Sequence, residues 1–325
     1  DGVAGSIEEF DAGGGGRRAV GWLWTVTDHP GRQAITQGID GHLLSENGKI
    51  SVDAQIMASD VPEGTGEGVF VNIGYAPRRG VQHKWSLDYL DDTIDINDLG
   101  FLGRNDLVAA DYSVSHRENN VPGLRDRDTS FNIDASFNTD NVLLGGRARL
   151  RRQWGLLNNH QVRGTLDYRP THWDDRNAFG NGNFRRNRRW SGQVRWDTDF
   201  ARDVVYSLEV ELDEESEGGL RGKIKGQLFL RPSDRLSVSL RAEYTERDAW
   251  LIYAGGRDFT AYKSAEWQPR ISVGSYFTAN QQLQFEMQWV GIKAAERRAY
   301  ELPVGGGSLN RVARDPLVAA KTFAI

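Results

Sequence analysis

The chain has 325 residues, a formal net charge of −5, a pI near 5.8 and no cysteine. Its apolar runs fall well short of the ~18 consecutive residues that a membrane-spanning helix needs, which excludes a helical membrane protein. The acidic pI argues against nucleic-acid binding, because that function needs a basic surface.

The N-terminal residues 1–16 show no hydrophobic period and end in four glycines, so we expect a flexible leader or linker there. From Arg17 onward, apolar and polar residues alternate in successive runs, and turn residues separate the runs. This pattern predicts about 16 strands, with a margin of about two. The expected strands are 17–27, 32–45, 48–60, 66–77, 81–91, 104–117, 127–138, 141–153, 158–170, 187–198, 203–213, 219–231, 235–247, 259–276, 280–294 and 316–325.

The clearest alternation lies between residues 219 and 244. Leu220, Ile224 and Leu228 share one face of the first run, and charged residues occupy the other face. After a short turn at 231–234, Leu236 and Tyr244 begin and end the apolar face of the returning run. The two runs predict an antiparallel hairpin with one apolar and one polar face.

Three features distinguish these strands from those of a soluble β-sandwich. The runs cover about 12 residues, against about 5–6 for a typical globular strand. Short turns alternate with long polar loops at about 91–104, 170–187, 247–258 and 296–315. Aromatic residues gather at the ends of the apolar faces, as at Tyr168, Trp190, Trp196 and Tyr244. Together they predict an all-β fold, an antiparallel transmembrane β-barrel over residues 17–325.

Residues 91–106 (DDTIDINDLGFLGRND) contain a motif formed by Asp95, Asn97, Asp98, Leu99, Gly100 and Phe101. On this motif and the spacing of the strands after it, the chain resembles an uncharacterised family of bacterial outer-membrane β-barrels. In that family a carbohydrate-binding-module-9-like domain precedes the barrel. The resemblance implies an outer-membrane location. Only residues 1–16 precede the predicted barrel, so we expect the carbohydrate-binding domain to be missing from this chain. The chain ends on Phe323-Ala324-Ile325 rather than on a terminal aromatic residue, so we expect a barrel that is incomplete at its C-terminus.

The polar faces of the predicted strands carry rows of charge. These are Arg147, Arg149, Arg151, Arg163, Arg169, Arg195, Glu209, Glu211, Arg221, Lys223, Lys225, Arg241 and Glu243. A symmetric turn at about 214–218 would place Glu211 opposite Arg221 and Glu209 opposite Lys223. One interpretation is an ion-paired wall that fixes strand register. The other is a field across a pore that orients a polar or anionic solute.

The predicted loop 170–189 combines His172, Trp173, Asp174 and Asp175 with five arginines. A solvated loop would contact lipopolysaccharide phosphates through its arginines. A loop folded inward would bind a sugar, with Trp173 as a stacking platform.

No residues are assigned to catalysis, and no cofactor is expected. The six histidines are scattered without zinc-ligand spacing, and Asp91, Asp92 and Asp95 form only a weak calcium candidate. We therefore expect a pore-like or transport-associated barrel that passes or binds a polar solute such as a saccharide, and that contacts outer-membrane lipid and lipopolysaccharide. A barrel-type hydrolase and an anchoring barrel of a larger complex remain as alternatives.

Overall fold

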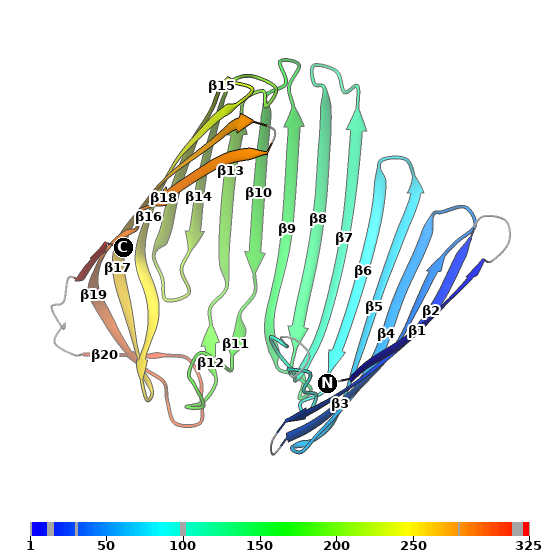
Figure 1. Cartoon of the computed structure of the whole chain (residues 1–325). Helices are drawn as coiled ribbons and strands as arrows, with labels where there is room; N and C mark the ends of the chain where they lie inside the picture. The colour runs from blue at the N-terminus through cyan, green and yellow to red at the C-terminus, as the bar shows by residue number, and fades with distance from the viewer. Residues whose placement is uncertain are drawn as a thin grey trace. The chain divides into compact units, whose positions relative to one another are not determined.

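The computed structural model describes residues 2–11, 16–29, 32–97, 102–278, 280–313 and 321–324. The chain is all-β, and nearly all of its strands belong to one large antiparallel sheet (Figure 1). Within the described residues there are 21 strands, four of which have only three or four residues. The remaining 17 agree with the predicted count of about 16 within its margin of about two.

The strands in chain order are β1 (Gly2–Asp11), β2 (Arg17–His29), β3 (Arg32–Leu44), β4 (Ile50–Val61), β5 (Gly64–Arg78), β6 (Val81–Leu90), β7 (Leu107–Asn119), β8 (Asp126–Phe137), β9 (Leu143–Gly155), β10 (Gln161–Arg169), β11 (His172–Asp174), β12 (Phe184–Arg186), β13 (Arg189–Asp197), β14 (Val204–Glu214), β15 (Leu220–Ser233), β16 (Leu236–Gly255), β17 (Asp258–Thr278), β18 (Gln281–Gln288), β19 (Gly291–Glu301), β20 (Asn310–Val312) and β21 (Lys321–Ala324).

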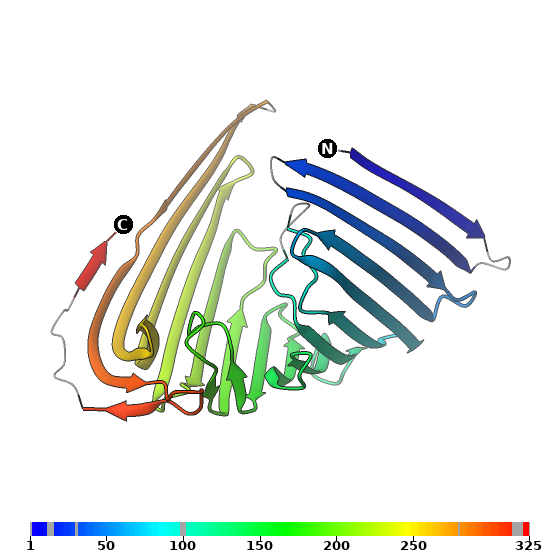
Figure 2. The ribbon, with the colours of Figure 1, turned by 90° about the horizontal axis from the view of Figure 1, so that it is seen from below.

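The chain divides into two compact units. The first comprises residues 1–117 and 130–148, and the second comprises residues 118–129 and 149–325. In the first unit, β1 to β7 pair in chain order, each antiparallel to the next. Figure 2 shows the first of these strands, in blue, side by side.

Strands in the second unit also pair with the next long strand along the chain, except that β17 pairs with two later strands. Strands β10, β13, β14, β15, β16 and β17 pair consecutively. The 21-residue β17 then pairs with β18 along its second part and with β19 along its first part. Where one strand was expected over 280–294, the chain therefore forms two, with the break at Trp289 and Val290.

The described sheet is not closed into the barrel that the sequence predicts. Among the described residues, β1 pairs with β2, and β21 pairs with β19. Alternation identifies strands and their faces, but it does not specify which two outer strand edges meet, and closure depends on that edge-to-edge register.

Two further expectations differ from the structure. Residues 2–11, expected to be a flexible leader, form β1 and pair with β2 from Gly2↔Val26 to Asp11↔Arg17. The polar loop expected over 247–258 is a tight hairpin, because β16 continues to Gly255 and β17 begins at Asp258. Gly255 and Gly256 have φ values of +125° and +58°, which allow the chain to reverse there.

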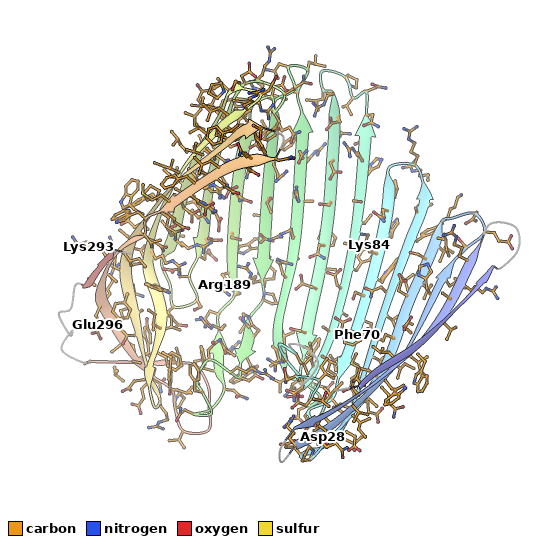
Figure 3. All side chains as sticks on the ribbon, in the orientation of Figure 1. Asp28, Phe70, Lys84, Arg189, Lys293 and Glu296 are labelled. Atoms are coloured by element: carbon orange, nitrogen blue, oxygen red, sulfur yellow. The ribbon has the colours of Figure 1, made fainter. Side chains whose placement is uncertain are left out.

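On several strands the large apolar side chains are exposed, and the polar side chains between them are more buried, which is the reverse of a soluble protein. On β14, Leu208, Val210 and Leu212 are 46%, 40% and 57% exposed, whereas Glu209 between them is only 9% exposed. The first unit shows exposed apolar side chains too, including Ile39, Ile56 and Leu87. The strands therefore present uncovered apolar faces in both units, and their side chains are drawn in Figure 3.

Candidate functional site

Ion pairs join most of the charged residues predicted on the polar face. In the first unit Arg147 pairs with Asp134 at 3.2 Å. In the second, Arg149 pairs with Asp167 at 2.6 Å, and Lys223 pairs with Glu243 at 3.2 Å. The structure thus places these residues in cross-strand pairs, as the ion-paired interpretation requires.

The most connected part of this network runs from β13 to β15. Arg195 bridges Asp197 at 2.8 Å and Glu209 at 3.4 Å. Arg221 contacts both Glu211 and Asp213. Each arginine therefore engages two carboxylates, which satisfies more of its donors than a single pair would.

The remaining charged residues of the rows have weaker partners. Arg163 donates to Gln153 at 2.8 Å, and Arg241 donates to Gln227 at 3.3 Å. Within the part of the chain that the structure describes, Arg151, Arg169 and Lys225 have no ion-pair partner. The polar face therefore carries basic groups that its own carboxylates do not neutralise.

The predicted facing pairs across β14 and β15 are displaced by two residues. Glu209 lies opposite Lys225, Glu211 opposite Lys223, and Asp213 opposite Arg221. The turn occupies residues 215–219, one position later than expected, because Gly218 and Gly219 both adopt positive φ, at +82° and +102°. Arg221 still reaches Glu211, but diagonally rather than from the facing position.

The segment between β10 and β13 is an ordered hairpin. β11 pairs with β12, with Trp173 opposite Arg185. Arg186 donates to Asp174 from Nε and Nη2 at 3.2 and 3.1 Å, and Asn177 donates to the same carboxylate. Burial opposes ionisation of Asp174, but the bonds from Asn177 and the Arg186 charge together lower its pKa. Asp174 therefore holds the hairpin together.

His172 lies in the same hairpin and is neutral near pH 7. Burial lowers its pKa, and the charges of Arg189 and Arg186 act in the same direction, against a hydrogen bond with the Pro170 carbonyl. The 3.0 Å contact between Nδ1 and that carbonyl requires Nδ1 to carry the proton. This leaves Nε2 as an acceptor.

A small hydrophobic cluster fixes the hairpin to the strands of the second unit. Phe184 is fully buried, and its ring lies 4.8 Å from that of Phe259, centroid to centroid. The other members of the cluster are Ala178, Ala249, Ala261, Tyr300 and Leu302. Local alternation does not predict this packing, because Ala178, Phe184, Ala249, Tyr300 and Leu302 come from segments expected to be polar loops, and their contacts with Phe259 and Ala261 join distant parts of the chain.

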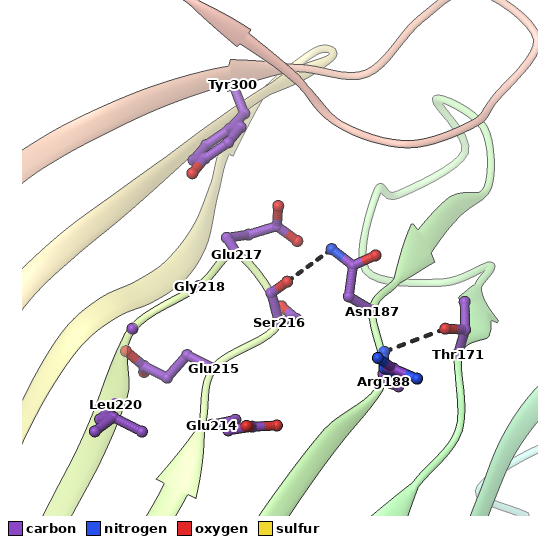
Figure 4. A pocket seen from close by; sticks show the side chains of 11 residues that line it. Thr171, Asn187, Arg188, Glu214, Glu215, Ser216, Glu217, Gly218, Leu220 and Tyr300 are labelled. Atoms are coloured by element: carbon purple, nitrogen blue, oxygen red, sulfur yellow. Dashed lines mark hydrogen bonds between the residues drawn. The ribbon is translucent and has the colours of Figure 1, made fainter.

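A cleft of about 920 Å³ lies beside the β14–β15 turn (Figure 4). Its lining consists of Thr171, Asn187, Arg188, residues 214–220 and Tyr300. Asn187 donates to the Ser216 carbonyl at 2.9 Å, and Arg298 donates to the Glu217 carbonyl at the same distance. These bonds attach the turn to neighbouring segments and hold the cleft in shape.

Two carboxyl groups of this turn have pKa values above the usual glutamate value. Burial raises the pKa of Glu217, although the Ser216 hydroxyl and the charges of Arg186 and Arg298 oppose the shift. Burial also raises the pKa of Glu215, against the hydrogen bond that it accepts from the Ala249 N–H. Among the described residues, Glu217 Oε1 is buried without a hydrogen-bond partner.

The acidic motif segment is occupied by hydrogen bonds within the protein. Asp91 accepts from the backbone N–H groups of Glu67, Thr93 and Ile94. Asp95 accepts from the Asn97 backbone at 2.9 Å and pairs with Arg32 at 2.9 Å. Their lone pairs are therefore engaged by protein donors, and the geometry does not support the calcium candidate.

Only some of the other motif residues lie in the described part of the chain. Asn97 accepts a hydrogen bond from the Leu102 N–H, and Asn105 donates to the Asp92 carbonyl at 2.7 Å. Asp98, Leu99, Gly100 and Phe101 lie outside the described residues. In the described ranges, no group of three or more potential ligands is placed to hold a metal ion. Those ranges also hold no helix that is long and apolar enough to cross a membrane.

The sequence profile of a family described as a domain of unknown function, DUF5916, matches residues 25–315. The chain belongs to this family. The DUF5916 match covers the polar face, the hairpin, the cleft and the motif segment. No curated protein matches the chain. The expected link to a carbohydrate-binding-module-9-like domain and the outer membrane stays a prediction.

Sequence reasoning missed the DUF5916 residues that form the cleft. Glu215 and Glu217 belong to an acidic run, EESEGG, that looks like an ordinary solvated turn. Its only distinguishing signal was the adjacent pair of glycines, which allows a tight reversal close to other segments. Tyr300 carried no signal, because its position beside the turn depends on the pairing of β17 with β19.

Proposed function

We propose that the sheet of this DUF5916 chain forms part of the wall of a bacterial outer-membrane β-barrel. Its apolar face would contact lipid, and its polar face would contact water. The main support is that large apolar side chains are exposed at every second position of a strand, as at Leu208, Val210 and Leu212. Exposed apolar side chains occur in both units. Uncovered apolar surface costs about 25 cal/mol per Å², so faces of this extent need an apolar environment.

The dimensions of the strands support a lipid environment. Strands β13 to β15 contain 9, 11 and 14 residues, and a tilted strand needs about 9–11 residues to cross the hydrocarbon core. Closure would require edges to meet beyond the pairings described above, since open edges are not tolerated in lipid.

Aromatic pairs at the strand ends support the same placement. Tyr168 and Trp190 lie 4.7 Å apart at one end of β10 and β13, whereas Trp196 lies near the other end of β13. Amphipathic rings favour the two membrane interfaces, which explains their position at the margins of the apolar face.

The polar face favours a water-filled path for a polar solute, with saccharides as one candidate class. Paired charges such as Arg195 with Glu209 are stable beside water, and unneutralised groups such as Arg151 would bias the path toward anions. Lipid and lipopolysaccharide would then be the partners of the opposite face and of the loops.

A hydrolase is the second candidate, and the cleft beside the β14–β15 turn is the observation that favours it. Glu215 and Glu217 both have raised pKa values there, as a general acid requires. An anchoring role needs neither a path nor a cleft.

The test is conductance of the purified full-length protein in a planar bilayer, with and without added oligosaccharide. The proposal predicts steady conductance that the sugar reduces, and a weaker anion preference in Arg151→Gln. Arg152→Gln is the matched control, because it removes the same charge from the other face of β9. A silent membrane protein would overturn the open path, and release of product from glycan or lipid substrates that is lost in Glu217→Gln would favour the hydrolase.

A further inference from the structure

The last residue of β10 and the first residue of β13 are both arginines, and they face one another. Arg169 lies directly opposite Arg189 in the register of the two strands. Directly opposed residues in an antiparallel pair have Cβ atoms about 4.5–5.5 Å apart, and like charges in that position repel. Arg189 is labelled in Figure 3.

The carboxylates around this pair are already engaged elsewhere. Asp167 pairs with Arg149 at 2.6 Å, Asp174 with Arg186 at 3.1 Å, and Asp213 accepts from Arg221 Nε at 2.7 Å. Within the described ranges, neither Arg169 nor Arg189 makes an ion pair or a side-chain hydrogen bond. Asp213 attracts the charge of Arg189, but this carboxylate is shared with Arg221, which it contacts directly.

Two further observations favour binding of an anion beside Arg189. The Nε atom of Arg189 is buried from solvent without any hydrogen-bond partner in the described part of the chain. Arg169, Arg186 and Arg221 lie close enough to Arg189 to repel its charge, whereas Asp213 attracts it. A buried donor that is left unsatisfied costs about 1–3 kcal/mol, so a ligand that accepts from it would be favoured.

We propose that Arg169 and Arg189 form a binding site for a phosphate-type oxyanion on the polar face, at the base of the β11–β12 hairpin. Guanidinium groups match the geometry of tetrahedral oxyanions, because two N–H donors can address two oxygens at once. The anion would offset the repulsion between the two arginines and accept from the orphaned Nε of Arg189.

His172 lies in the same hairpin and adds no charge to the site. Its lowered pKa leaves it neutral, so it adds no charge to the hairpin above the two arginines. The inference does not require the sheet to lie in a membrane, since it rests on the polar face alone. Oxyanion binding without conductance would keep this site and remove the proposed path.

The experiment is calorimetric titration of inorganic phosphate into the purified full-length protein at constant ionic strength, with chloride as the reference salt. Saturable binding is expected, and Arg169→Gln or Arg189→Gln should weaken it about tenfold to a hundredfold. Lys225→Gln removes one positive charge from another row of the same face and should bind phosphate as the unaltered protein does. Equal binding in all of these proteins, or no saturable binding, would overturn the site.

Thermal unfolding separates a binding role from a structural one. Without phosphate, Arg189→Gln should unfold at a higher temperature than the unaltered protein, because the repulsion is removed. With phosphate, only the unaltered protein and Lys225→Gln should gain stability. A lower unfolding temperature for Arg189→Gln in both conditions would assign the residue a structural role and overturn the proposal. Displacement of phosphate by phosphatidic acid micelles would identify a lipid headgroup as the source, and failure to displace it would identify a soluble phosphate compound.

Discussion

Phe184 is the residue that most directly connects the β11–β12 hairpin to the rest of its unit. Its ring is fully buried against Phe259, whereas the nearby Phe179 is 73% exposed. The two phenylalanines lie in the same segment, but Phe184 is buried in the cluster, whereas the exposed ring of Phe179 contacts Tyr253, with the ring centroids 5.0 Å apart. Comparing them tests how much of the anchoring comes from the buried ring.

We expect Phe184→Ala to release the hairpin. Removal of a fully buried phenylalanine costs about 3–5 kcal/mol, and here that loss falls on local opening of the segment. Limited trypsin digestion should then cut at Arg176, Arg185, Arg186 or Arg188 much faster than in the unaltered protein. Phe179→Ala removes only an exposed ring contact with Tyr253 and should raise the rate of cleavage much less. Equal protection in both variants would show that the cluster does not hold the hairpin.

The Glu217 carboxyl group makes the cleft sensitive to pH. Because burial raises its folded-state pKa above the usual glutamate value, the folded state holds the proton more tightly than the unfolded chain. Its contribution to stability is therefore present at low pH and is lost as the pH rises through the folded pKa.

Glu217→Gln mimics the protonated form and should remove this part of the pH dependence. Thermal unfolding midpoints measured across the acidic to neutral range should fall less with rising pH in the variant than in the unaltered protein. Asp234→Asn, in the exposed turn between β15 and β16, makes the same carboxyl-to-amide change away from the cleft and should retain the dependence. A pH dependence that survives unchanged in Glu217→Gln would refute the assignment.

At the scale of elements, the segment after β6 is held against β5 by a close backbone approach. A Cβ atom placed on Gly66 would lie 2.2 Å from the backbone nitrogen of Ile94 and 2.6 Å from the carbonyl carbon of Thr93. Ile94 is itself fully buried. Only glycine at position 66 allows the motif segment to pack in this way.

Gly66→Ala should therefore displace residues 91–97 at a cost of about 1–3 kcal/mol. Hydrogen exchange followed by mass spectrometry should show faster exchange at the Thr93 and Ile94 amides, which are hydrogen-bonded to Asp91. Gly41→Ala is the control, because a Cβ there meets nothing within 4 Å. Unchanged exchange in Gly66→Ala would contradict the account of the motif.

The elements also show where prediction from the sequence ends. Local alternation was enough to identify β14 and β15 and to separate Leu208 from Glu209 by face, because side-chain direction has a period of two along a strand. Local alternation could not predict the register between the two strands, because the register depends on which residues form the turn. Contacts between distant segments, such as Phe184 with Phe259 or Arg32 with Asp95, leave no local pattern at all.

For the whole molecule, the decisive property is the uncovered apolar face of the sheet. A soluble β-sandwich would cover such a face with a second sheet and leave the charged face in water. Here Leu208, Val210 and Leu212 are exposed while Glu209 is nearly buried, and this reversal is the observation on which we base the proposal of a lipid environment. The same reasoning applies to each unit by itself.

Cysteine scanning along β14 is the most direct test of this claim, because the chain contains no cysteine of its own. Single cysteines at positions 208 to 212 would be studied in the full-length protein in vesicles, with a water-soluble thiol reagent and with a label quenched by nitroxide lipids. The account predicts alternation, with quenching at 208, 210 and 212 and aqueous labelling at 209 and 211. Quenching at none of the five positions, or at the two glutamate positions instead, would contradict a lipid-facing apolar surface.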